Sequence, residues 1–386
     1  MSLISPDNDF ALMAALFVIA GGAFLAEKTR IGSHLTGAPI AILVAIAAAN
    51  LQLIPHAAPA YDFVFSYFVP VLIPLFLFKA NLRKMLFETT RMTIAFLVAS
   101  LGTIVGVIIA VGLLDLGSLA PVADIDPAMR EAGIAGLFAS TYIGGSVNYA
   151  ALGEITGLRA DASFFSAATA TDNLFSALFL TVLAVLPGLT WLASRFTQHE
   201  HGEKQAEEIT TERISAASLT LATAAAIGFV AIGDAITGAI EMPSLRYAVI
   251  TSLVLVAATA FPHWMERLRG GFELGVGLAF VFFVAIAAGA DIIAMVNIAP
   301  LLIVLVVILL SVHLAVLLSV GQLFRLTLPE LIIASNAAVL GATTAPALAA
   351  ARGWHDLVTP GVLVGVLGYA LGTFAGTAIF FLWGLF

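Results

Sequence analysis

Two short polar stretches interrupt otherwise apolar segments, and each combines glycine with hydroxyl and amide side chains. The first reads TYIGGSVN, from Thr141 to Asn148, and the second reads SNAAVLGATTAP, from Ser335 to Pro346. Glycine destabilises a helix interior by about 1 kcal/mol, and proline removes a backbone hydrogen bond and clashes with the preceding turn. We therefore predict that a helix breaks in each stretch and leaves backbone N–H and C=O groups free to bind a ligand.

Broken helices inside a membrane are tolerated only within protein or beside a water-filled cavity. The N–H groups at the start of a half-helix suit an anion, whereas exposed carbonyl groups suit a cation. The residues that we expect to bind a substrate are Ser140, Thr141, Gly144, Gly145, Ser146, Asn148, Ser335, Asn336, Gly341, Thr343 and Thr344. The alternative is that both stretches are close-packing surfaces, since small residues often line contacts between membrane helices.

Asp172 is the most informative ionisable residue. It lies in ATATDNLFSALFL, roughly 15 Å along the apolar segment that follows the first stretch. An acid at the centre of a bilayer costs about 2.5–3.5 kcal/mol on insertion scales, so such residues usually have a function. With Thr169 and Asn173, Asp172 could bind Na⁺ or a proton. A neutral carboxyl group that is hydrogen-bonded for packing is the alternative.

Two further residues are candidates for ion coupling. His313 lies within the apolar sequence LLSVHLAVLL, where a proton relay and a hydrogen-bonded structural histidine are equally compatible with the pattern. Asp291 lies near a segment end. His199 and His201 belong to a polar stretch that reads as a solvated linker, so we expect no resident metal.

Several classes of chemistry lack their sequence signature. There are no cysteines, which excludes disulfides and thiolate metal sites. No nucleotide-binding loop, HExxH or GxSxG motif occurs, so we expect no enzyme, no catalytic residue and no cofactor other than Na⁺ as a coupling ion. The net charge is −8 without a basic block, so nucleic acid is not an expected partner.

Composition defines the class of protein. The 386 residues are 61% hydrophobic and 10% charged, against about 45–50% and about 25% in soluble domains. The sequence therefore predicts an all-α, multi-pass integral membrane protein whose partner is the lipid bilayer. About twelve helical segments are expected near 10–26, 38–54, 63–78, 92–114, 132–155, 162–193, 215–236, 245–262, 274–290, 298–324, 328–351 and 359–386.

The two halves of the sequence resemble each other. Aligning Ala139-Ser140 with Ala334-Ser335 places Gly157-Leu158 over Gly353-Trp354, and a separate alignment places Asn81 over Asp291. We therefore predict an internal duplication, with a first repeat over 1–194, a polar cytoplasmic linker over 195–213 and a second repeat over 214–386.

Charge predicts how these repeats are oriented. Basic residues follow the segments that end near 26, 78, 262 and 324, as in Lys28, Lys79, Arg267 and Arg325. If one interrupted segment in each half, 132–155 and 328–351, is broken or re-entrant, every basic loop is cytoplasmic, and the repeats have inverted topology. The N-terminus, which carries Asp7 and Asp9 but no basic residue, is then outside and lacks the features of a cleavable signal.

Three stretches, SYFVPVLIPLFLFKANLRKML, ASTYIGGSVNYAALGEITGL and LIIASNAAVLGATTAPALAAARGW, resemble the domain-of-unknown-function family 819. That family consists of uncharacterised membrane proteins of bacteria and plastids and is distantly similar to cation/proton antiporters, bile-acid sodium symporters and 2-hydroxycarboxylate transporters. The resemblance implies a bacterial plasma (inner) membrane, a mobile core domain, and a scaffold domain through which a homodimer could form. In the antiporters an acidic pair stands where this chain has Asp172-Asn173. The chain departs from the family pattern at Leu340-Gly341, where a glycine pair is usual, and at Asn81, near which an Asp is usual.

These features predict a secondary active transporter that works by alternating access, with an elevator motion of the core. It would move a small, anionic organic solute with Na⁺ or H⁺. A pure cation/proton antiporter and a membrane scaffold protein without transport activity are the alternatives.

Overall fold

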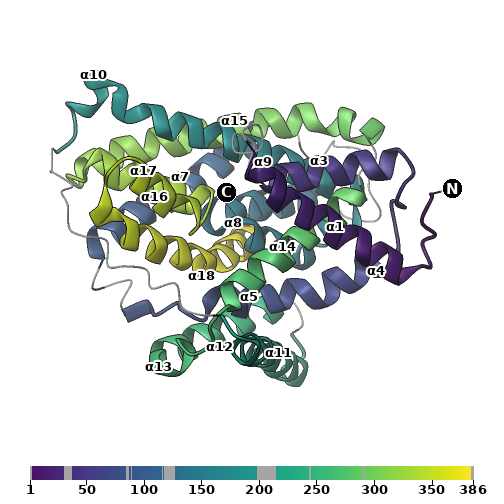
Figure 1. Ribbon diagram of the computed structural model, residues 1–386. Helices are drawn as coiled ribbons and strands as arrows, with labels where there is room; N and C mark the ends of the chain where they lie inside the picture. Colours follow the sequence, from purple (N-terminus) through teal and green to yellow (C-terminus); the bar gives the residue numbers. More distant parts are fainter. Residues whose placement is uncertain are drawn as a thin grey trace.

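The computed structural model describes residues 2–29, 37–83, 87, 89–114, 116, 127–197, 214–242, 245–289 and 292–383. Within these ranges the chain is helical and has no β-strand (Figure 1). Eight of the described helices or helix runs are long and apolar enough to cross a membrane. The prediction of an all-α integral membrane protein is therefore confirmed. Asp291, His199, His201 and most of the predicted linker lie outside the described residues.

The helices follow one another with short connections. Those of the first half are α1 (Asp9–Glu27), α3 (Gly37–Asn50), α4 (Pro59–Phe63), the π-helix η1 (Val64–Phe68), α5 (Val69–Leu77), α7 (Thr90–Leu113), α8 (Pro127–Ile155), η2 (Leu158–Ala160), α9 (Ala162–Val185), η3 (Leu186–Gly188) and α10 (Thr190–Ala193). Those of the second half are α11 (Ala216–Ala239), α12 (Arg246–Ala260), α13 (Pro262–Met265), α14 (Gly271–Ala288), α15 (Ile292–Leu323), α16 (Leu328–Val339), α17 (Thr344–Ala351), η5 (His355–Leu357) and α18 (Val358–Leu382).

Helix α9 connects two opposite ends of the molecule. It begins beside Arg159 and runs for 24 residues, about 35 Å at 1.5 Å per residue. Near its last turn, the carbonyl group of Ala184 accepts a hydrogen bond from the Arg352 guanidinium group. We refer to the end with Arg159 and Asp62 as the Arg159 end, and to the end with Arg91, Arg325 and Arg352 as the Arg91 end.

Helix α8 turns back on itself. Gly145 has φ 71° and ψ −173°, which divides the helix into two halves. Such a conformation is open essentially only to glycine. A Cβ atom on Gly133, in the first half, would lie 3.1 Å from Leu158, which follows the second half. Both halves therefore begin and end at the Arg159 end, and α8 forms a re-entrant hairpin, hairpin 1, with its tip at Gly145.

Helices α16 and α17 form a second hairpin, hairpin 2, that enters from the Arg91 end. Gly341, with φ 96°, lies in the break between them. The break is closed by the Thr344 hydroxyl group, which donates to the Asn336 side-chain oxygen at 2.6 Å. The far end of α17 returns to the Arg91 end, where Arg352 contacts α9.

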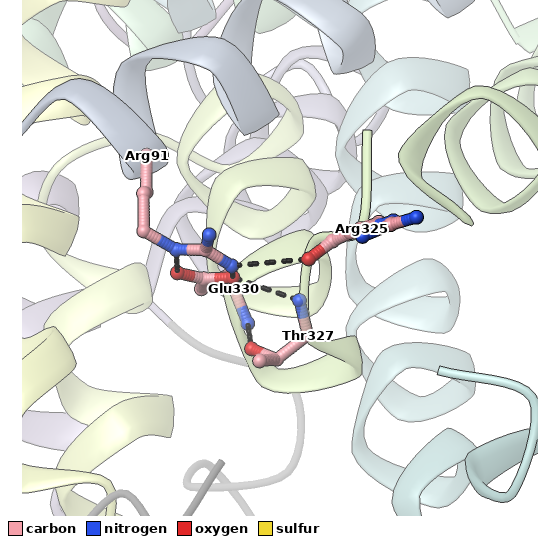
Figure 2. Close-up of polar contacts among 4 residues, drawn as sticks. All are labelled: Arg91, Arg325, Thr327 and Glu330. Atoms are coloured by element: carbon pink, nitrogen blue, oxygen red, sulfur yellow. Dashed lines mark hydrogen bonds and ion pairs between the residues drawn. The ribbon is translucent and has the colours of Figure 1, made fainter. Parts of the chain in front are cut away.

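An ion pair anchors the base of hairpin 2. Arg91 of α7 donates from Nε and Nη2 to the two carboxylate oxygens of Glu330, at 2.6 and 2.8 Å (Figure 2). Glu330 also accepts from the backbone N–H of Thr327 at 2.7 Å, and Thr327 caps α16 in return. Arg91 further donates to the carbonyl group of Arg325. This network, which is typical of a capping box reinforced by charge, fixes where hairpin 2 begins.

The helices pack as two groups. Helices α7, α8, α9, α15, α16, α17 and α18 contact mainly one another, as do α1, α3, α4, α5, α11, α12 and α14. In the first group, α18 packs along hairpin 1 through glycine: Cβ atoms on Gly368 and Gly376 would lie 2.5 and 2.6 Å from backbone oxygens of α8. Figure 1 shows α16, α17 and α18 at the left of the molecule and α11 and α12 below α5. We call the first group the core and the second the scaffold.

Candidate functional site

The tips of the two hairpins meet at one residue. A Cβ atom on Gly145 would lie 3.5 Å from the Tyr369 ring, and one on Gly341 would lie 3.0 Å from the Tyr369 hydroxyl oxygen. The same hydroxyl group accepts a hydrogen bond from the backbone N–H of Ala342 at 3.4 Å. Tyr369, near the middle of α18, therefore connects both interruptions that the sequence predicts.

A cavity of about 330 Å³ lies between these tips and the scaffold. Its polar wall comes from the core. The predicted site residues in this wall are Thr141, Gly145, Ser146, Asp172, Asn173, Thr343 and Thr344. Its apolar wall comes mostly from the scaffold and contains Phe24, Phe76, Val276, Phe280 and Phe283. Glu27 and Asp172 bring the negative charge, and the described lining residues include no Lys or Arg.

Asp172 occupies the polar wall as a buried carboxylate, with 7% of its surface exposed. Its Oδ2 accepts a hydrogen bond from the Thr141 hydroxyl group of hairpin 1 at 3.3 Å. Its Oδ1 is buried and has no hydrogen-bond partner among the described residues. The Tyr142 hydroxyl group lies close to Asp172 without meeting the geometry of a hydrogen bond. An unsatisfied carboxylate oxygen in a low-dielectric site is costly, and a bound cation or proton would remove that cost.

Hairpin 2 brings a second unsatisfied group near the cavity. Asn336 is completely buried and accepts from Thr344, but its side-chain nitrogen has no partner among the described residues. Thr343 precedes α17 and does not cap it through its side chain. The first N–H groups of α17 therefore lack a side-chain acceptor at the place where the cavity meets hairpin 2.

Other predicted site residues lie behind the cavity wall. The Nε2 atom of His313 is 2.8 Å from the Ser335 hydroxyl group, and its Nδ1 atom is 3.0 Å from that of Thr103. Thr103 also donates to the carbonyl group of Tyr142 at 3.1 Å. Polar contacts thus run from hairpin 2 through α15 and α7 to hairpin 1. His313 is completely buried and does not line the cavity.

The remaining predicted residues serve local packing. Asn148 donates to the carbonyl group of Gly144 at 2.6 Å and accepts from the Thr373 hydroxyl group at 2.5 Å, which ties hairpin 1 to α18. Ser140 donates to a carbonyl group within its own helix. Thr169 donates to the Tyr149 hydroxyl group at 3.0 Å, behind Asp172.

Sequence reasoning missed several cavity residues. Tyr369, Ser176, Phe76, Phe280 and Phe283 all line the cavity. The phenylalanines carry no chemical signal in a lipid-facing sequence, because apolar residues are expected everywhere in it. Tyr369 lies in the glycine-rich sequence VLGYALGTFAG, where a polar tip on an otherwise apolar helix is a weak signal for a site.

The donor set suits a monovalent cation better than a resident metal. No group of three or more His, Cys, Asp or Glu side chains comes together in the described part of the chain. Asp172 and Thr141 supply oxygen, and hydroxyl and amide groups of Ser146, Asn173 and Ser176 line the same cavity. Oxygen ligands of this kind are those that hard cations prefer.

A second cavity, of about 420 Å³, lies at the Arg159 end. It is lined by His56, Asp62, Glu154 and Arg159, together with apolar residues such as Phe165 and Ile286. The Arg159 guanidinium group pairs with Glu154 and, at 3.1 Å, with Asp62 of α4, and it lies 3.9 Å above the Phe65 ring. This contact joins the base of hairpin 1 to the scaffold.

The fold and the sequence together define a multi-pass integral membrane protein. The chain belongs to the family described as "Protein of unknown function (DUF819)", which matches residues 14–382. It is 35% identical to the "Uncharacterized membrane protein YjcL" of Bacillus subtilis (strain 168) over 396 residues, which covers 97% of each chain.

Proposed function

We propose that the protein is a secondary active transporter that moves a small, anionic organic solute together with Na⁺ or H⁺. The observation that carries the proposal is a buried carboxylate, Asp172, whose free oxygen lines a cavity beside the tips of two oppositely directed hairpins. Paired helix breaks are the usual site of a transporter, and a buried acid beside them is the usual coupling residue.

Coupling follows from the arrangement of the polar wall. Asp172 contacts Thr141 of hairpin 1, so the charge state of the carboxylate acts on the hairpin directly. A cation or proton on Asp172 neutralises the cavity and favours the entry of an anion. The N–H groups at the start of α17 then face the negative charge of the solute.

Alternating access is supported by the two cavities. The first lies between the scaffold and the hairpin tips, and the second lies at the Arg159 end of the same boundary. Movement of the core against the scaffold would close one and open the other. The hairpins begin at opposite ends, which accords with inverted repeats and an elevator motion.

The remaining expectations form part of this proposal. The protein would reside in the bacterial plasma membrane with its N-terminus outside and the Arg91 end in the cytoplasm. It would catalyse no covalent reaction, and its scaffold would form a homodimer.

Transport and coupling can be measured in proteoliposomes loaded with pH- and Na⁺-sensitive dyes. A symporter is expected to move Na⁺ or H⁺ only when a transported solute is supplied. Exchange of Na⁺ for H⁺ without any organic solute would instead identify a cation/proton antiporter. A silent response to every ion and solute gradient, from protein that is folded by thermal melting, would leave only a non-transporting scaffold role.

A further inference from the structure

Tyr369 is the residue at which both hairpins and the scaffold converge. Its hydroxyl group contacts the tip of hairpin 2 at Ala342, and its ring edge adjoins Gly145 of hairpin 1. On its third side, its ring centroid lies 5.1 Å from that of Phe76 in α5. The side chain is thus placed to sense the position of all three bodies.

The hydroxyl group of Tyr369 has a proton to donate. A phenol both donates and accepts hydrogen bonds. Here the oxygen accepts from the Ala342 N–H group, while the O–H group donates to no acceptor in the described part of the chain. Because Tyr369 lines the cavity, this donor is available to a molecule inside it.

Donors and acids occupy different parts of the cavity. The Tyr369 hydroxyl group and the start of α17 at Thr344 lie together at hairpin 2, whereas Asp172 lies on α9 with Thr141. The described lining contains no Lys or Arg, so neutral donors alone would hold a negative group there. Neutral donors suit a single negative charge better than two or three, because each further charge would lack a cation to offset its desolvation.

We infer that Tyr369 is a specificity-determining residue, whose hydroxyl group donates a hydrogen bond to a singly charged carboxylate group of the solute while it accepts from the hairpin 2 tip. This inference rests on the proposed function and refines it, since it separates an anion subsite at Tyr369 from the ion subsite at Asp172. The contact with Phe76 would then report the bound solute to the scaffold.

The test uses the full chain in detergent and four sodium carboxylates: formate, acetate, propionate and pyruvate. Melting temperature is measured against carboxylate concentration at constant Na⁺ and ionic strength, with chloride as the replacement anion, which yields an apparent Kd for each. Because a hydrogen bond to a charged group is worth about 1.5–3 kcal/mol, Tyr369→Phe should bind the stabilising carboxylate about 10- to 100-fold more weakly.

A matched control is Tyr61→Phe. Tyr61 is buried and donates to the Pro55 carbonyl group at 2.9 Å, but it does not line the first cavity. This variant should lose stability without a change in apparent Kd. The same pattern in Tyr369→Phe, a lower melting temperature with unchanged carboxylate affinity, would show a structural role and overturn the inference.

Failure of the inference and failure of the proposed function give different results. If Na⁺ or protons stabilise the wild-type protein through Asp172 but no carboxylate in the set does, the anion subsite is refuted and ion coupling stands. If neither ion nor carboxylate changes the melting temperature, both are refuted.

Discussion

The hydroxyl group of Thr141 donates to the Asp172 carboxylate at 3.3 Å, and this bond joins the tip region of hairpin 1 to the middle of α9. Thr141 lies one turn before the break at Gly145, so the bond connects the acid to the part of the hairpin that must respond to a ligand. The second carboxylate oxygen, Oδ1, remains without a partner in the described chain. An ion that binds there would act on both elements.

Asp172→Asn should abolish stabilisation by the coupling ion. An amide has the shape of the carboxylate but neither its charge nor its capacity to bind a proton. The expected result is a melting temperature that no longer rises with Na⁺, or with acidification if the ion is a proton. Thermal melting of the purified protein across Na⁺ concentration and pH measures it.

The control for this substitution lies on the same helix. Asp161 caps α9 by accepting from the Phe164 N–H group at 2.9 Å, and asparagine caps helices as well as aspartate does. Asp161→Asn should therefore keep the ion response. Undiminished stabilisation by Na⁺ and by protons in Asp172→Asn would remove Asp172 from the coupling role.

Gly145→Ala should destabilise the protein through the backbone. Its φ of 71° with ψ of −173° is a conformation that alanine rarely adopts, so the strain should cost about 1–3 kcal/mol. The melting temperature of the purified variant measures this cost. Gly228→Ala in α11 is the matched control, since nothing lies within 4 Å of its added Cβ atom and its φ is not positive. Equal melting temperatures for the two variants would contradict the observed break.

Glu330→Gln should loosen the base of hairpin 2. Glutamine keeps the capping bond to Thr327 but loses the charge that faces Arg91. Because Glu330 is 7% exposed and Arg91 56%, we expect a loss of about 1–2 kcal/mol, less than for a fully buried pair. Denaturation of the purified protein measures it.

The comparison for Glu330 is an ion pair of similar geometry that is more open to solvent. Asp234 and Arg246 form two bonds at 2.6 and 2.9 Å, with exposures of 44% and 30%. Asp234→Asn should cost less than about 1 kcal/mol. A larger loss there than in Glu330→Gln would argue against anchoring by Glu330.

His313→Gln should lower stability and leave the ion response intact. The ring connects Thr103 to Ser335 behind the cavity wall, and loss of these partners should cost about 1–3 kcal/mol. His263→Gln, at a side chain 92% exposed, should change little. If Na⁺ or proton stabilisation disappears in His313→Gln, then His313 takes part in coupling, as the proton-relay reading of the sequence predicts.

The sequence identified both helix breaks because their residues are costly in a continuous helix. Gly144-Gly145 and Gly341 have little use in an apolar helix interior unless the backbone turns there. It identified Asp172 for a similar reason, since an acid inside a bilayer has a large insertion cost. Strong local penalties of this kind can be read without neighbours.

The direction of the chain after each break was left open by the sequence. Whether α8 crosses or returns depends on Gly133 packing against Leu158 and on Gly376 packing against α8, which are contacts between distant positions. The placement of His313 between two hydroxyl groups also depends on three different helices. Pattern along one helix holds no record of such contacts.

Composition and local penalties alone therefore determined an all-α membrane protein with two interrupted helices and one costly buried acid, because hydropathy and backbone preference belong to each residue and its immediate neighbours. Only the tertiary structure decided that both interruptions are hairpin tips entering from opposite ends, that Tyr369 joins them, and that Asp172 rather than His313 lines the cavity. Those relationships arise from packing between segments up to hundreds of residues apart, where close approach of glycine-lined helices and satisfaction of buried polar groups select one arrangement.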